Sequence, residues 1–172
     1  DLLCVLGASP FLATILYTQK HLLQSLFLGN TFLRPKSEAD MLQELNQRIP
    51  NYASFPQLQK ELRLFKKREI LRIGARDLCG KADFSEIVAE LSTLAAAALK
   101  KACEISGKIL KDEFGAPRMD ENNPDMEAEF TVLGMGKLGG NELNFSSDID
   151  LMYFFSASSG MTEGIEDPLG NV

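Results

Sequence analysis

Apolar and polar positions follow a helical rhythm over the first two-thirds of the chain, most clearly after Asp83. Apolar residues there recur at spacings of three and four, which places them on one helix face. They are Phe84, Ile87, Val88, Leu91, Leu94, Ala95, Ala98, Leu99 and Ala102. Asp83 and Glu86 form the pattern of a capping box. We expect a helix that packs against a core and ends between Gly107 and Gly115.

Four further helices are expected before this one, each with a start or stop signal. Ser9 and Pro10 supply an N-cap and a first helical residue, and Ser37 with Asp40 can cap another helix. Gly80 is a C-terminal stop signal. The expected ranges are about 10–17, 20–28, 38–49 and 57–78.

Three arginines in the last of these helices, Arg68, Arg72 and Arg76, share one face because they are four residues apart. Their pattern has two interpretations. They can form a solvated basic face, or a docking surface for an acidic partner or for the acidic stretch later in the chain.

The composition changes after residue 120. Five acids and no base lie between Asp120 and Glu129, which is typical of an exposed linker. Apolar runs at 130–133 and 149–155 then predict two buried strands. The predicted fold is α+β, a mostly helical region followed by a sheet with helices. We divide the chain into a helical region at 1–120, a linker at 121–128 and the first part of a second domain at 129–172.

Composition narrows the functional classes. The 172 residues carry a net charge of −6, which disfavours nonspecific nucleic-acid binding. No apolar run reaches the roughly 18 to 20 residues that span a bilayer, and no signal peptide is recognisable at the first residues. A start without Met suggests a fragment. Three widely spaced cysteines favour reduced thiols and a cytoplasmic location. A single histidine disfavours a zinc site or a Ser-His-Asp triad.

A glycine-rich turn follows the first predicted strand. Gly134, Gly136 and Gly139 satisfy G-x-G-x-x-G, the pattern of a dinucleotide-binding turn. That fold should place an acid where Phe154 stands, so we disfavour it. A P-loop is disfavoured too, because Leu138 follows Lys137 where Ser or Thr is required.

Asp148 and Asp150 flank Ile149 at the start of the second predicted strand. Alternation along a strand would place both carboxylates on one face. Two adjacent carboxylates resist full ionisation unless a cation lies between them, and Mg²⁺ is a hard cation that takes oxygen ligands. The plainer interpretation is a pair of capping or salt-bridged acids.

The glycine turn and the aspartates together predict one site for nucleotidyl transfer. Metal held by Asp148 and Asp150 would bind the phosphates that the turn cradles. The candidate phosphate-binding residues are Gly134, Gly136, Lys137, Gly139, Gly140, Ser146 and Ser147. Lys137 can instead be a solvated turn residue, and the two serines can instead cap the turn. The arrangement resembles the polymerase-beta superfamily, although that superfamily usually has Gly-Gly or Gly-Ser where this chain has Gly136-Lys137.

The stretch GMGKLGGNELNFSSDIDL, residues 134–151, resembles the signature of bacterial glutamine synthetase adenylyltransferases. Weaker support comes from LLCVLGASPFLATIL near the start and from IGARDLCGKADFSEIVAELSTLA at 73–95. The resemblance thus extends over nearly the whole chain. It implies a fragment of an enzyme with two similar polymerase-beta-like halves.

According to this resemblance, one half attaches AMP from ATP to a tyrosine of glutamine synthetase. The other half removes AMP by phosphorolysis, with inorganic phosphate as substrate and ADP as product. The form ELNFSSDIDL is more similar to the removing half. The implied metal is Mg²⁺, with Mn²⁺ as the alternative, and a PII-type nitrogen-signalling protein is an implied partner.

Three readings therefore stay open: the removing half, the attaching half, and a noncatalytic module that senses nucleotide or docks a partner. The family's third carboxylate lies on a downstream strand that this chain does not contain, so we expect little activity from the chain alone.

Overall fold

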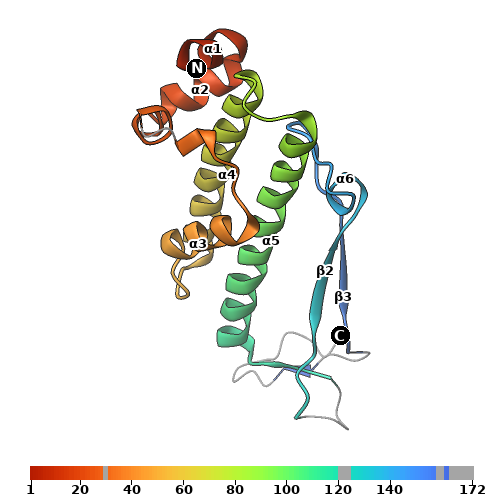
Figure 1. The fold of residues 1–172 in the computed structure, drawn as a ribbon. Helices are drawn as coiled ribbons and strands as arrows, with labels where there is room; N and C mark the ends of the chain where they lie inside the picture. The colour runs from red at the N-terminus through yellow and green to blue at the C-terminus, as the bar shows by residue number, and fades with distance from the viewer. Residues whose placement is uncertain (29–30, 120–124, 158–160, 163–172) are drawn as a thin grey trace.

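A computed structural model of the chain describes residues 1–28, 31–119, 125–157 and 161–162. Long helices α4 and α5 run side by side, and a β-hairpin lies along the other flank of α5 (Figure 1). The helices are α1 (Leu2–Ala8), α2 (Pro10–Thr18), α3 (Glu38–Arg48), α4 (Phe55–Leu78), α5 (Phe84–Phe114) and α6 (Gly136–Gly139). The strands are β1 (Pro117–Arg118), β2 (Phe130–Gly134), β3 (Leu151–Phe155) and β4 (Met161–Thr162).

The helix boundaries follow the sequence signals closely. The Ser9 hydroxyl accepts from the backbone N–H of Leu12, and Pro10 opens α2. Ser37 and Asp40 form a complete capping box at α3. Gly80, with φ of +61°, follows α4, and Gly115, with φ of +82°, ends α5. These predictions are confirmed.

Two details differ from the predictions. The α1 helix was not foreseen, and the predicted helix at 20–28 contains a π-helical segment at Leu23–Leu28. At α5 the Asp83 carboxylate accepts from the backbone N–H of Glu86, as expected. The Glu86 side chain, however, pairs with Arg76.

The apolar core lies where α3, α4 and α5 meet. From Ile87 to Leu94 the apolar stripe of α5 packs inward, as its spacing predicts, but Phe84 at its start is exposed, which corrects the prediction for that residue. Residues that share this core include Met41 and Leu45 of α3, Phe65 and Leu71 of α4, and Leu91 and Leu94 of α5.

A buried ion network crosses this core. Arg72 donates to Glu69 at 2.6 Å and also to Glu90 of α5, and Arg76 donates to Glu90 as well. The arginine side chains are almost fully buried, so both interpretations of the basic face are wrong for Arg72 and Arg76. Arg68 is half-buried and pairs with Glu44 at 3.1 Å. Four-residue spacing correctly predicted a shared face but could not show that this face meets acids on α5.

Glu69 is the most enclosed acid of this network. Its carboxylate accepts from Lys36 Nζ at 2.8 Å and from Arg72 Nε. Burial by itself would raise the pKa of Glu69, but attraction to Arg72 and Lys36 outweighs burial and holds that pKa below its ordinary value. The ionised network is therefore favoured despite its low exposure.

The β2 and β3 strands form an antiparallel pair with Val132 opposite Tyr153. The first predicted strand is confirmed, but the second begins at Leu151, two residues later than expected. Both strands were expected to be buried, and this is wrong: Phe130 and Phe155 are exposed, as is Phe154 on the other face. The described residues also include a short antiparallel pair of β1 and β4.

These elements agree with an α+β class. The boundary at 121–128 stays a prediction, and residues 121–124 of it lie outside the described residues. In the described part of the chain, no helix has the length and apolar character to cross a membrane.

Candidate functional site

Strand pairing brings the glycine turn next to the aspartates. Gly134 at the end of β2 lies opposite Leu151 at the start of β3. The ladder continues for one more bond, because the Met135 N–H donates to the Asp150 carbonyl at 2.8 Å. The two motifs, separated by a dozen residues in sequence, therefore meet at one end of the hairpin.

Glycine is required at different positions of the turn for different structural reasons. Gly136 adopts φ of +53°, which side chains other than glycine rarely tolerate. A Cβ on Gly136 would lie 3.6 Å from Asp150 Oδ2, so the Asp150 carboxylate is beside the bare turn. A Cβ on Gly139 would lie 2.6 Å from the Gly134 carbonyl oxygen. These glycines allow a close approach of backbone to backbone and of backbone to carboxylate.

Other candidate residues lie around the same turn. Lys137 is exposed on α6, and Gly140 follows the end of that short helix. Asn141 adopts φ of +57°, which helps reverse the chain. The turn therefore presents an exposed lysine directly after Gly136.

Ser146 and Ser147 take part in a local hydrogen-bonded turn. Both hydroxyls donate to Asn144 Oδ1, at 3.2 Å and 2.7 Å, and the Ser146 N–H donates to the same oxygen. The Asn144 N–H in turn donates to the Ser147 hydroxyl at 3.3 Å. The capping interpretation of these serines is thus present in the structure, and phosphate binding by them stays a prediction.

Asp148 and Asp150 are both exposed and precede β3. They are on the segment that leads into the strand, so strand alternation alone does not place both carboxylates on one face. No group of three or more His, Cys, Asp and Glu side chains suited to a metal occurs in the described ranges. Carboxylate pairs do suit Mg²⁺, which in nucleotide sites combines one or two carboxylates with phosphate oxygens and waters. Asp150 beside the open turn and Asp148 two residues before it fit that donor set.

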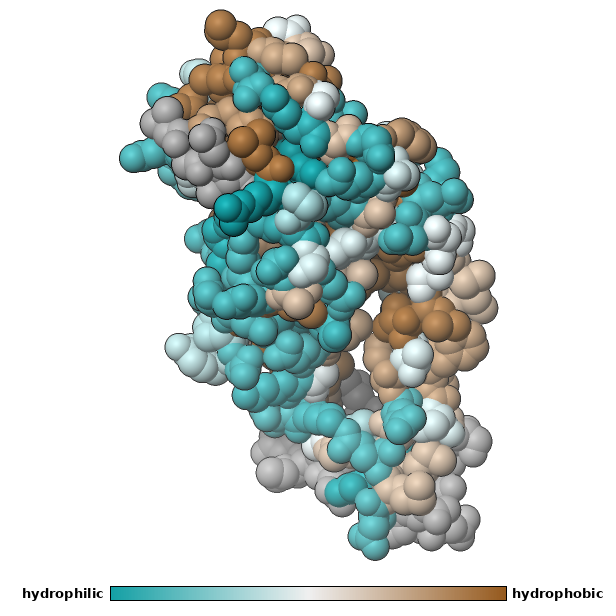
Figure 2. Space-filling model, viewed as in Figure 1, coloured by the Kyte–Doolittle hydropathy of each residue, from teal (hydrophilic) through white to brown (hydrophobic). Residues whose placement is uncertain are grey.

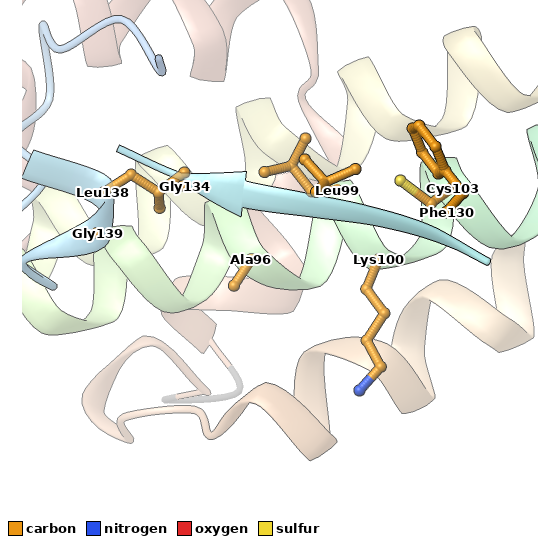
Figure 3. A pocket seen from close by; sticks show the side chains of 9 residues that line it. Ala96, Leu99, Lys100, Cys103, Phe130, Gly134, Leu138 and Gly139 are labelled. Atoms are coloured by element: carbon orange, nitrogen blue, oxygen red, sulfur yellow. The ribbon is translucent and has the colours of Figure 1, made fainter. Parts of the chain in front are cut away.

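A cavity of about 400 Å³ separates the hairpin from α5 (Figures 2 and 3). Ala96, Leu99, Lys100 and Cys103 of α5 line one wall, and Phe130, Val132, Gly134, Leu138 and Gly139 line the other. Gly134 and Gly139, which line the cavity, belong to the glycine turn, so the cavity adjoins that turn. Neither Asp148 nor Asp150 is among the residues that line it.

Sequence reasoning missed the residues that hold the turn against the helices. Leu143 is buried in the helical core, and its N–H donates to the Ser92 hydroxyl at 3.0 Å. Phe145 lies against Gly74 of α4. A glycine inside a helix was the available signal for Gly74, whereas nothing in the sequence distinguished Ser92.

A glycine turn followed by a carboxylate pair has the chemistry to hold phosphate groups together with a divalent cation. Comparison with known sequences narrows this class. Residues 1–170 match the family described as Glutamate-ammonia ligase adenylyltransferase, and the chain belongs to that family.

Curated relatives agree with this assignment. The chain is 37% identical over 167 residues to a bifunctional glutamine synthetase adenylyltransferase/adenylyl-removing enzyme of Thioalkalivibrio sulfidiphilus. It is 36% identical over 170 residues to that of Nitrosococcus oceani and 35% identical over 167 residues to that of Pseudomonas aeruginosa. These matches cover 97%, 98% and 97% of this chain but 17% of each relative. The chain thus spans about one sixth of the length of the relatives it matches.

Proposed function

We propose that this chain forms part of a nucleotidyltransferase site that controls glutamine synthetase by reversible adenylylation of a tyrosine. The carrying observation is the backbone pairing that joins the glycine turn to Asp150. The names of the relatives support glutamine synthetase as the target, because each name gives glutamine synthetase as the protein acted on. Each name also includes both the adenylyltransferase and the adenylyl-removing activity. A PII-type protein as regulator remains a prediction from the family resemblance, and a cytoplasmic location remains a prediction from the three widely spaced cysteines.

Each part of the site has a task in this proposal. Asp148 and Asp150 would hold Mg²⁺, which neutralises charge on the phosphates when it is bound. The turn at Gly134–Gly140 would supply backbone N–H groups to phosphate oxygens, because the absence of side chains at Gly136 and Gly139 leaves the backbone accessible. Lys137 would add a positive charge at the exposed rim of the turn. Positioning and charge neutralisation account for most of the catalysis in such reactions.

We further propose that this site belongs to the half that removes AMP. An oxygen of inorganic phosphate attacks the adenylyl phosphorus, and a new P–O bond forms. The bond from phosphorus to the tyrosine oxygen breaks, and that oxygen keeps the electron pair and takes up the proton of the phosphate. The products are ADP and unmodified tyrosine. Support for this half comes from the form ELNFSSDIDL.

The test uses the full-length parent protein with Asp148→Asn. Release of ADP from adenylylated glutamine synthetase should fall on the order of 10²- to 10³-fold, because a charged group at the reacting phosphate is lost. Attachment of AMP from ATP should continue. Both reactions are followed by mass spectrometry of glutamine synthetase and by measurement of ADP.

Asp112→Asn is the matched control, because Asp112 is exposed on α5 away from the turn. It should leave both reactions unchanged. Loss of attachment in place of removal would assign this site to the attaching half. If Asp148→Asn changed neither reaction, the site would not be catalytic.

A further inference from the structure

The segment between the glycine turn and the aspartates is fastened to the helical part of the molecule. Leu143 is only 7% exposed and joins the core formed by α3, α4 and α5. Its backbone N–H donates to Ser92 Oγ of α5 at 3.0 Å. The Ser92 hydroxyl donates in turn to the Val88 carbonyl at 2.9 Å, so its oxygen is oriented to accept from Leu143.

A second contact fixes the same segment against α4. A Cβ built on Gly74 would lie 3.6 Å from Cε1 of Phe145 and 2.7 Å from Cδ1 of Leu12. The bare backbone of α4 therefore makes room for Leu12 of α2, and the Phe145 ring lies near the same position. Two helices thus hold two residues of the segment, Leu143 and Phe145.

The chain between these anchors and Asp148 has little freedom. Asn144 follows Leu143 directly, and its side-chain oxygen accepts from the hydroxyls of Ser146 and Ser147. The Ser147 N–H also donates to the Asn144 carbonyl at 3.2 Å. Because Asp148 follows Ser147 directly, hydrogen bonds link the Ser92 anchor to the start of the aspartate pair.

We infer that Ser92 is a positioning residue for the nucleotidyltransferase site: its hydroxyl fixes the segment 143–147 and thereby the placement of Asp148 and Asp150. This inference rests on the proposed function of those aspartates. A buried N–H that loses its acceptor is costly, so removal of the hydroxyl should release the segment locally. The helical region would then be a part of the active site's framework.

Ser92→Ala in the full-length parent protein tests the inference with two readouts. Hydrogen exchange of peptides that cover 141–147, measured without metal or nucleotide, should accelerate by about tenfold at the Leu143 amide. The Mg²⁺ concentration required for half-maximal ADP release should rise by about tenfold, as for residues that orient metal ligands. The first readout does not depend on the proposed reaction.

Thr93→Val is the matched control. The Thr93 hydroxyl donates to the Ala89 carbonyl at 2.9 Å, one residue along α5, in the same helical geometry. Its replacement removes the same kind of bond without touching the segment, so both readouts should remain at their wild-type values. Ser92→Thr keeps the hydroxyl, so both readouts should remain at their wild-type values in this variant as well.

Two results would overturn the inference while leaving the proposed function intact. One is that Ser92→Ala and Thr93→Val give equal values in both readouts, while Asp148→Asn loses ADP release. The other is faster exchange in Ser92→Ala with unchanged Mg²⁺ dependence, which would make Ser92 merely structural. Should Ser92→Ala not fold, Ser92→Cys replaces it, because sulfur is a weak acceptor. The same shifts are expected there, and their absence would overturn the inference.

Discussion

The helical region at 1–114 and the hairpin unit at 130–155 differ in the kind of side chain that they bury or expose. The helical region buries charge: Glu69, Glu90, Arg72 and Arg76 are each at most 4% exposed, and opposite charges face one another. The hairpin unit exposes apolar side chains on both faces. Figure 2 shows hydrophobic surface along the hairpin and also at the end of the molecule that carries α1 and α2, with a more hydrophilic surface between them.

This difference shows where the described residues complete a core and where they do not. Helices α3, α4 and α5 supply acids and bases to one another, so the network is satisfied locally. A strand that is apolar on both faces is typical of a sheet covered on both sides. Among the described residues, only the side of the hairpin unit toward α5 has a neighbouring element, and a cavity separates the two. The stability of the two regions should therefore respond differently to comparable substitutions.

The largest effect is expected from Glu90→Gln in the helical region. Glu90 accepts from Arg72, from Arg76 and from the Lys36 N–H, so the change takes one of two carboxylate partners from each of two buried guanidinium groups. The free energy of unfolding of the 172-residue chain should fall by about 3 to 5 kcal/mol. Denaturant unfolding measures this change.

Glu38→Gln is the control for that substitution. Glu38 pairs with Lys100 at 3.3 Å, and both side chains are largely exposed. Its loss should cost less than about 1 kcal/mol, as for surface ion pairs in general. Equal effects of the two changes would show that burial does not distinguish this network from a surface pair.

An intermediate effect is expected from Gly139→Ala in the hairpin unit. The added methyl group would approach the Gly134 carbonyl oxygen to 2.6 Å, so the backbone must shift, at a cost of about 1 to 3 kcal/mol. Gly107→Ala in α5 is the counterpart, because nothing lies within 4 Å of its Cβ position. That change should stabilise the chain by about 0.5 to 1 kcal/mol. A destabilising Gly107→Ala, or a neutral Gly139→Ala, would contradict the packing described.

The smallest effect is expected from Phe154→Ala, compared with the same change at Phe65. Phe154 is 47% exposed on the outer face of the hairpin, whereas Phe65 is fully buried. Phe65→Ala should cost about 3 to 5 kcal/mol, and Phe154→Ala should cost less than about 1 kcal/mol. Both are measured by thermal unfolding of the 172-residue chain. A comparable cost at Phe154 would mean that the hairpin is packed as tightly as the helices, and the contrast between the regions would disappear.

The sequence by itself determined the features that depend on local chemistry. Caps at Ser9, Ser37 and Asp83, and glycine stops at Gly80 and Gly115, set the helix boundaries because backbone groups at helix ends need nearby partners. The first strand was also predicted correctly, from the apolar run at 130–133. The motif at 134–151 indicated the family, and the matches to relatives confirm it.

Only the tertiary structure decided features that depend on residues distant in sequence. It turned the arginine face of α4 inward, because Glu90 of α5 and Glu69, which also pairs with Lys36, neutralise the buried arginines. It left the hairpin exposed, because burial depends on which elements cover a strand and not on the strand's own pattern. It also brought Leu143 to Ser92, 51 residues away in sequence, a contact that no local pattern encodes.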